Sequence, residues 1–207
     1  MMKLSFKPVL IKVFIFILCL LPLVLGIWDG FADQLGANPI EEITHRTGDW
    51  TLRLLLITLA ATPARRLFGW AWPLRVRRML GLYTFFYACL HFLTYFVLDQ
   101  FFDWDEILKD IIKRPYITIG FSAFLLLIPL SVTSTNAMMR KLGKRWGQLH
   151  QLVYVIAVFG ILHYLWLVKA DYLQPLIHAG ILLALLLVRA WYQRQTSSLR
   201  RTASQAS

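Results

Sequence analysis

The sequence has few cysteines, few acidic residues and no long polar segment. Its two cysteines, Cys19 and Cys89, stand alone within apolar runs and lack the CxxC spacing of redox pairs and zinc sites. No GxGxxG or other phosphate-cradling glycine pattern is present, and no repeat of fixed period is visible. These absences exclude a disulfide framework, a zinc ribbon and a nucleotide-binding domain within the sequence.

The sequence is instead rich in apolar residues, which make up 58% of its 207 positions. Water-soluble domains contain roughly 45–50%. Six apolar segments each approach the ~20 residues that cross a ~30 Å hydrocarbon core. They cover about 9–28, 47–64, 78–99, 115–132, 148–168 and 172–191. We predict an all-α, polytopic membrane protein with one six-helix transmembrane domain over residues 1–195, and a disordered polar tail over 196–207.

The net charge of +11 is distributed unevenly between the connections. Acidic residues concentrate in the first and third connections, near 29–42 and 99–110. Basic residues precede the first segment, fill the second and fourth connections and follow the last segment: Lys3, Lys7, Lys12, Arg65, Arg66, Arg75, Arg77, Arg78, Arg140, Lys141, Lys144, Arg145, Arg194, Arg200 and Arg201. Basic loops stay on the cytoplasmic side of a membrane. The pattern therefore predicts cytoplasmic termini and a cytoplasmic tail, and it does not indicate nucleic-acid binding.

Two segments allow more than one interpretation. The first apolar segment could be a cleaved signal peptide, but its apolar run is too long and no small-x-small site follows Gly26, which favours a retained span. The connection over 99–114 mixes aromatic and acidic residues, which predicts a short amphipathic helix on the outer membrane surface.

His91, His150 and His163 lie inside apolar segments, where a polar ring costs free energy unless it gains a partner. At 1.5 Å per residue, His91 is ~12 Å and His163 ~9 Å from the outer boundary, on segments that run in the same direction. Two imidazoles at one depth can bind a haem iron from both faces. His178 reaches the same level, so spacing does not rank it against His163 as the partner of His91. The competing interpretation is histidines hydrogen-bonded across helices.

His150 precedes His163 by 13 residues, ~20 Å along a helix, which suits a second cofactor near the cytoplasmic face. Thirteen residues also rotate a straight helix by ~140°, so the two histidines share one face only if the helix start is distorted. Arg77, at 14 residues before His91, cannot ligate iron but can pair with propionates or phosphates. We predict that His150 supports an inner cofactor whose acidic groups are anchored by Arg77 and Arg78.

Several sequence blocks carry a family resemblance. They are Thr47-Gly48, Leu54-Leu55-Leu56, Thr62-Pro63-Ala64-Arg65-Arg66, Arg77-Arg78-Met79-Leu80-Gly81-Leu82, Leu90-His91, Thr133-Ser134-Thr135-Asn136, Leu142-Gly143, Trp146, Leu149-His150, Leu152-Val153-Tyr154 and Leu162-His163-Tyr164-Leu165-Trp166. From about residue 45 to 191, the sequence resembles the haem-binding membrane subunits of bacterial methionine sulfoxide reductase systems. These subunits are a branch of the ferric-reductase-like transmembrane family.

The resemblance implies a six-helix bundle that holds b-type haem in the bacterial inner membrane. It implies electron transfer from the quinone pool or a cytoplasmic flavin reductase to a periplasmic, molybdopterin-containing, MsrP-like reductase that repairs oxidised proteins. It favours His163 over His178 as the partner of His91 and matches His150 to an inner ligand. Arg77 departs from the wider group, whose oxidases carry an inner histidine there.

We therefore expect an electron-transfer subunit of an oxidoreductase complex, with no catalytic residues of its own and a separate donor. One haem b is expected, with an inner second haem or FMN as further candidates, since a flavin phosphate would suit Arg77, Arg78 or Arg145. The basic, aromatic connection from Arg65 to Arg78 fits an interfacial belt and also a docking surface for the donor. The alternatives are a quinol-oxidising cytochrome b serving another periplasmic acceptor, and a cofactor-free transporter or structural bundle.

Overall fold

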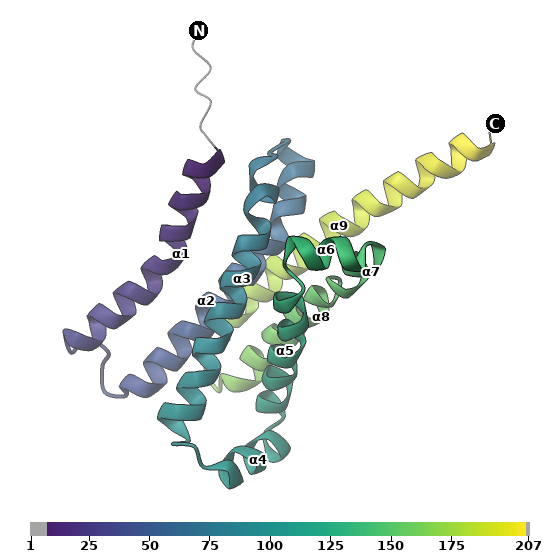
Figure 1. The fold of residues 1–207 in the computed structure, drawn as a ribbon. Helices are drawn as coiled ribbons and strands as arrows, with labels where there is room; N and C mark the ends of the chain where they lie inside the picture. Colours follow the sequence, from purple (N-terminus) through teal and green to yellow (C-terminus); the bar gives the residue numbers. More distant parts are fainter. Residues whose placement is uncertain (1–7, 206–207) are drawn as a thin grey trace.

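The computed structural model describes the backbone of residues 8–205 and the side chains of residues 9–195, and this part of the chain is helical without any strand. Figure 1 shows the helices in chain order. They are α1 (Pro8–Phe31), α2 (Pro39–Phe68), α3 (Trp72–Leu93), the π-helical turn η1 (Thr94–Asp99), α4 (Trp104–Lys113), α5 (Pro115–Val132), α6 (Asn136–Leu142), α7 (Lys144–Leu149), α8 (Leu152–Leu167) and α9 (Leu173–Gln205).

Local sequence signals explain where α2 begins and ends. The side chain of Asn38 accepts a hydrogen bond from the Glu41 backbone N–H and so satisfies one of the free donors of the first turn. Glu41 itself lies in that turn, where a negative charge complements the helix dipole. At the other end, Gly69 adopts φ 72° and its N–H bonds to the Arg65 carbonyl. The chain then turns within three residues into α3.

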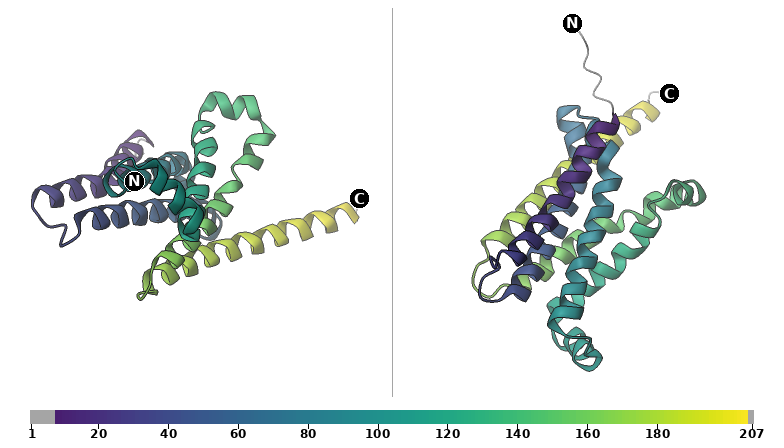
Figure 2. Two further views of the ribbon diagram at one scale, coloured as in Figure 1. Left: turned by 90° about the horizontal axis from the view of Figure 1, so that it is seen from below. Right: turned by 60° about the vertical axis from the view of Figure 1, so that its left-hand side comes forward.

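The bundle consists of two antiparallel hairpins with one helix beside each. α2 pairs with α3 and α5 pairs with α8, while α1 packs against α2 and α3, and α9 packs against α2 and α8 (Figure 1). Buried Leu55, Ala88, Leu127, Ala157 and Leu182 form the core between the hairpins. Figure 2 shows the α5–α8 pair diverging from the α2–α3 pair toward the end that carries α6 and α7.

Five helical stretches in the described residues are long and apolar enough to cross a membrane: Val9–Phe31, Trp72–Asp99, Pro115–Val132, Lys144–Leu167 and Leu173–Gln195. Many of their large apolar side chains are exposed, as expected where lipid is the solvent. The expected second span is absent from this set because Asp49, Arg53 and several threonines lower the apolar character of α2. α2 nevertheless runs the length of the bundle beside α3 (Figure 1). The sixth span therefore stays a prediction.

Three details of the predicted organisation were wrong. The connection from Arg65 to Arg78 is helical except at 69–71, because α2 and α3 continue beyond their apolar parts. The segment 148–168 belongs to the confirmed stretch Lys144–Leu167 but is not one uninterrupted helix, since α7 ends at Leu149 and α8 starts at Leu152. The polar tail is not disordered from residue 196, because the α9 backbone stays helical to Gln205; residues 206–207 lie outside the described part.

The predicted short helix over 99–114 is formed as α4. The side chain of Asp103 caps it by accepting hydrogen bonds from the Asp105 and Glu106 backbone N–H groups. Its inner face buries Asp110, which accepts from the Tyr95 hydroxyl at 3.2 Å and pairs with Arg114 at 3.0 Å. Its outer face leaves Trp104, Leu108 and Ile112 exposed. α4 thus closes one end of the bundle directly before α5.

Candidate functional site

His91 of α3 and His163 of α8 meet in the interior of the bundle. Their ring centroids are 6.0 Å apart, and the ring planes are inclined by 77°. The two helices belong to different hairpins, so the pair forms at the interface between the hairpins. The two residues are 72 positions apart in the sequence, and tertiary packing alone brings them together.

A backbone carbonyl of the neighbouring helix orients each ring. His91 Nδ1 lies 2.9 Å from the Thr44 carbonyl oxygen, and His163 Nδ1 lies 2.7 Å from the Tyr116 carbonyl oxygen. A carbonyl oxygen can only accept, so each Nδ1 carries the hydrogen and donates it. In a neutral imidazole this leaves the Nε2 lone pair available to a metal. The same arrangement orients metal-ligating histidines generally.

A glycine faces each ring from the same helix that supplies the carbonyl. A Cβ at Gly48 would come within 3.0 Å of the His91 ring. A Cβ at Gly120 would come within 2.6 Å of His163 Nδ1, closer than real Cβ contacts allow. Any larger residue would therefore push the imidazole away from its carbonyl partner. These glycines have a steric role, and neither was identified from the sequence.

The two halves of this arrangement are related by a constant shift in the sequence. Thr44, Gly48 and His91 correspond to Tyr116, Gly120 and His163 with an offset of 72 residues, and each histidine lies 47 residues after its carbonyl partner. The same offset relates the α2–α3 hairpin to the hairpin of α5 with α7 and α8. The sequence shows no repeat of fixed period, yet the two hairpins are arranged alike. Few identities survive, so geometry reveals the repeat better than sequence.

The spacing of the imidazole pair fits one metal ion between the rings. Two imidazole nitrogens bound to one ion at about 2.0–2.1 Å place the ring centroids roughly 6–6.5 Å apart when the bonds are collinear. The observed centroid distance is 6.0 Å. Within the described residues, no group of three or more His, Cys, Asp or Glu side chains is placed to hold a metal ion. Such a pair suits an iron whose remaining ligands come from a macrocycle.

His178, the other predicted partner of His91, occupies a different position. It is buried on α9, and its Nδ1 lies 2.8 Å from the Gln174 carbonyl oxygen of its own helix. Its ring contacts Tyr164 edge-on, with centroids 6.0 Å apart. The structure thus places His163 opposite His91 and packs His178 behind α8, where it has the properties of a core histidine.

A cavity of about 600 Å³ lies between the hairpins toward α6 and α7. Ligand pockets typically measure roughly 300–1,000 Å³. His150, Arg77 and Arg78 all line this cavity, together with Arg75, Arg189 and Ser134. The sequence predicted that His150, Arg77 and Arg78 act on one cofactor, and the fold brings all three to the same cavity. The wall combines an imidazole with several cations, a composition suited to an anionic group.

The break between α7 and α8 positions His150. Its Nδ1 lies 3.1 Å from the Trp146 carbonyl oxygen, its ring stacks on the Trp146 indole at 3.9 Å, and its Nε2 is 3.4 Å from Ser134 Oγ. The helix is thus interrupted between His150 and His163, which is the distortion that a shared face would need. The 72-residue offset maps His150 onto Arg78, so Arg78, and not Arg77, occupies the equivalent position in the other hairpin.

Other side chains hold both arginines. Arg78 donates to the Asn136 side-chain oxygen, and an Arg78 guanidinium nitrogen lies 3.5 Å from Met139 Sδ. Arg77 lies 3.4 Å from the Thr62 hydroxyl. The contacts of Arg78 reach from α3 to α6 and so connect the two hairpins at the open end of the bundle.

Comparison with known proteins gives the same fold family. Residues 47–161 match the family model described as "Ferric reductase like transmembrane component". Relatives named "Protein-methionine-sulfoxide reductase heme-binding subunit MsrQ" are 58% identical in Herminiimonas arsenicoxydans (91% of this chain, 89% of the relative) and 59% identical in Rhodospirillum rubrum (86% of each). One from Xanthomonas axonopodis is 53% identical over 85% of this chain and 82% of its own length.

The chain belongs to the MsrQ family. Its membership confirms the predicted family and a helical, polytopic membrane protein. The matched region of the family model begins at Thr47 and ends at Ile161, so it contains His91 and His150 and stops two residues before His163. In this MsrQ family member, Thr44, Gly48, Tyr116 and Gly120 complete the surroundings of the histidine pair. The signal in the sequence that could have identified the glycines is that each lies 43 residues before a histidine.

Proposed function

We propose that this protein carries electrons across the bacterial inner membrane through b-type haem held between His91 and His163. The observation that supports this most directly is the imidazole pair, with both Nδ1 atoms occupied by carbonyls and both Nε2 atoms available. The relatives' printed name, a heme-binding subunit, agrees with it. When bound, the haem supplies one-electron chemistry, and the protein supplies ligands, orientation and an apolar surrounding.

The residues around the pair have defined tasks in this function. The Thr44 and Tyr116 carbonyls hold each imidazole in one tautomer, and Gly48 and Gly120 leave space for the rings. The hairpin interface keeps the ligands at a fixed separation, since buried residues of α2, α3, α5 and α8 pack around it. A fixed geometry suits electron transfer, because little needs to reorganise when the iron changes charge.

We further propose that the cavity beside His150 holds a second cofactor, either an inner haem or FMN. His150 would be its one imidazole contact, and Arg77 and Arg78 would pair with propionates or with a phosphate. The imidazole–arginine combination favours a group with an acidic side over a second bis-imidazole site. Arg145, the other predicted phosphate partner, does not line this cavity.

The electron donor in this proposal is the quinone pool or a cytoplasmic flavin reductase, and the acceptor is a periplasmic molybdopterin-containing, MsrP-like reductase. Both termini lie in the cytoplasm in this proposal, so the basic ends of α2 and α3 would face a cytoplasmic flavin reductase, whereas a quinone would reach the protein from within the bilayer. The protein is then an electron-transfer subunit of a methionine sulfoxide reductase, and the partner carries the catalytic residues. The name of the relatives supports a role in that reductase system.

A reconstituted assay tests this function. The full-length protein in nanodiscs is reduced with a quinol, or with a flavin reductase and NADH, while the haem absorption is followed. Addition of the periplasmic reductase and methionine sulfoxide should reoxidise the haem and yield methionine. A haem that is reduced but reoxidised only by another periplasmic acceptor would indicate a different cytochrome b. A protein without haem absorption would indicate a transporter or structural bundle.

A further inference from the structure

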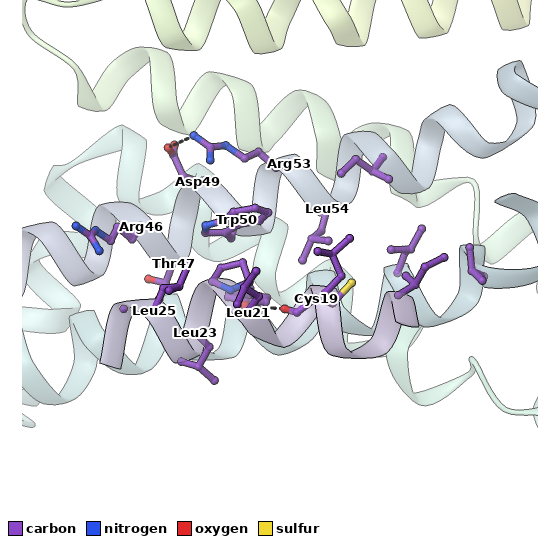
Figure 3. A pocket seen from close by; sticks show the side chains of 18 of the residues that line it. Cys19, Leu21, Leu23, Leu25, Arg46, Thr47, Asp49, Trp50, Arg53 and Leu54 are labelled. Carbon is purple, nitrogen blue, oxygen red and sulfur yellow. Dashed lines mark hydrogen bonds and ion pairs between the residues drawn. The ribbon is translucent and has the colours of Figure 1, made fainter. Parts of the chain in front are cut away.

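An apolar groove lies between α1, α2 and α3, separate from both the histidine pair and the cavity beside His150. Its volume is about 1010 Å³, and most of its wall is aliphatic. Figure 3 shows the groove with Leu21, Leu23 and Leu25 on one side and Leu54 on the other. It forms because α1 touches its neighbours at few points, among them Tyr83 and Tyr87 of α3, whose hydroxyls bond to the Phe16 and Cys19 carbonyls.

The groove is as long as the membrane is thick. On α2 its lining runs from Ile43 to Ala64, which spans ~32 Å at 1.5 Å per residue. The hydrocarbon core is ~30 Å thick, so an acyl chain of one leaflet would fill about half of the groove. Trp70 and Trp72 line its other end. A single apolar chain longer than one leaflet, such as a polyprenyl tail, can occupy the whole groove.

The end of the groove near Arg46 is polar but offers no free cation. Arg46 binds Asp29 and also Glu42, the latter at 2.6 Å, and Arg53 binds Asp49 at 3.0 Å. Among the residues that line the groove, each arginine is thus paired with a carboxylate. A phosphate head group would meet no unpaired positive charge here. An uncharged head group with acceptor oxygens is favoured, because Trp50 offers an indole N–H, whereas the Thr47 hydroxyl already donates to the Ile43 and Thr44 carbonyls.

This polar end adjoins the support of the histidine pair. Thr47 lines the groove, while the next residue, Gly48, faces the His91 ring from the same helix, and the Thr44 carbonyl holds that ring. Tyr87 also lines the groove, one helical turn before His91 on α3. Only the width of α2, about 10 Å with its side chains, separates the head-group end from the imidazole.

We propose that this groove binds one polyprenyl quinone or quinol, with its ring at Thr47 and Trp50 and its tail along α1 and α2 toward Trp72. The inference deepens the proposed function, on which its purpose rests, because it assigns the quinone donor a binding site. The binding itself follows from length, apolar lining and charge pairing. It requires no redox step and can be measured on the oxidised protein.

Photolabelling tests the assignment. The full-length protein is reconstituted in phosphatidylcholine nanodiscs with an azido-ubiquinone that carries a full polyprenyl tail, and labelled peptides are identified by mass spectrometry. Label should concentrate on peptides of α1, α2 and α3 around Thr47 and Trp50, and excess unlabelled ubiquinone should remove it. Label spread over all lipid-facing helices, or removed equally by excess phosphatidylglycerol, would show a lipid groove and overturn the proposal.

Two variants sharpen the test. Trp50→Phe removes the indole donor and should weaken labelling about fivefold, the factor expected for one hydrogen bond of ordinary strength. Ala60→Trp fills the half-buried middle of the groove and should abolish labelling of that region. Leu183→Trp adds the same bulk on an exposed α9 position and should change nothing. Unchanged labelling in both groove variants contradicts the assignment.

Haem content is measured in every sample, so the two hypotheses fail separately. Wild-type protein without haem would remove the proposed electron transfer whatever the label shows. Protein with haem but without groove label would remove only the quinone site. If Ala60→Trp does not fold, as judged by circular dichroism and gel filtration, Trp50→Phe alone decides, since it changes little volume.

Discussion

At the scale of single residues, the orientation of His91 and His163 depends on the atoms opposite each ring. The histidine depth followed from the sequence, because apolar runs define a membrane position and 1.5 Å per residue converts it to a level. The choice between His163 and His178 did not follow from spacing, since both reach one depth. The deciding factor is the rotation of α8 and α9 about their axes, which packing sets and apolar composition does not reveal.

The glycine positions give a graded prediction. Gly120→Ala should reduce haem retention more than Gly48→Ala, because the added Cβ would lie 2.6 Å from the His163 ring but 3.0 Å from the His91 ring. Gly180→Ala is the control, since a Cβ there would meet nothing within 4 Å. Haem per polypeptide after purification measures the effect. Equal retention in all three variants would contradict a steric role for the two glycines.

At the scale of elements, the sequence predicted the long helices better than the boundaries between them. Apolar runs locate spans because the bilayer requires them. They do not show how far a helix continues into water, so the extensions of α2 and α3 toward Gly69 were missed. The interruption at 150–151 was also unmarked by glycine or proline. Its cause is tertiary: Trp146 donates its indole N–H to the Thr133 carbonyl, which ties α7 to the end of α5.

Helix α4 supports the surroundings of the His91–His163 pair through the buried carboxylate of Asp110. Asp110→Ala would leave the Tyr95 hydroxyl and Arg114 without that partner at the point where the chain enters α5. We expect a loss of about 1 kcal/mol of stability, mainly from the part-buried Tyr95 hydroxyl, because Arg114 is half-exposed and its ion pair is screened. Thermal unfolding in detergent measures this. The exposed Asp105 on the same helix provides the matched control, and a Tm in Asp110→Ala equal to that of Asp105→Ala would refute the role.

At the scale of the whole molecule, the fold is a pair of similar hairpins whose symmetry holds at one site and fails at the other. The 72-residue offset superposes His91 on His163 but His150 on Arg78. The His91–His163 pair therefore has two equivalent imidazoles. The cavity beside His150 has one imidazole, with Arg78 at the equivalent position of the other hairpin. The sequence indicated this asymmetry through Arg77, which lies 14 residues before His91, whereas the 13-residue separation of His150 from His163 corresponds to Arg78.

The two sites should be separable. His150→Ala should remove the cofactor of the inner cavity and leave the outer haem in place, since no contact links His150 to His91 or His163 among the interactions of the described residues. Redox titration of the absorption spectrum would show one component lost and one kept. Loss of all haem would mean that the two sites depend on each other.

The topology tests whether α2 crosses the membrane. Reporter fusions after Gly36 and Asp103 should read periplasmic, and fusions after Gly69 and Lys141 should read cytoplasmic. The Gly69 fusion is decisive, because α2 falls outside the set of clearly apolar spans. A periplasmic reading at Gly69 would mean that α2 does not cross, and the six-span arrangement would be wrong.

The central claim is that His91 and His163 together bind haem iron. The most direct test is a pyridine haemochrome assay with iron counted per polypeptide, on wild type, His91→Ala, His163→Ala and His178→Ala. The account predicts b-type haem in wild type and His178→Ala, and the same one-haem loss in His91→Ala and His163→Ala. A wild-type protein without haem, or haem lost in His178→Ala but kept in His163→Ala, would contradict it.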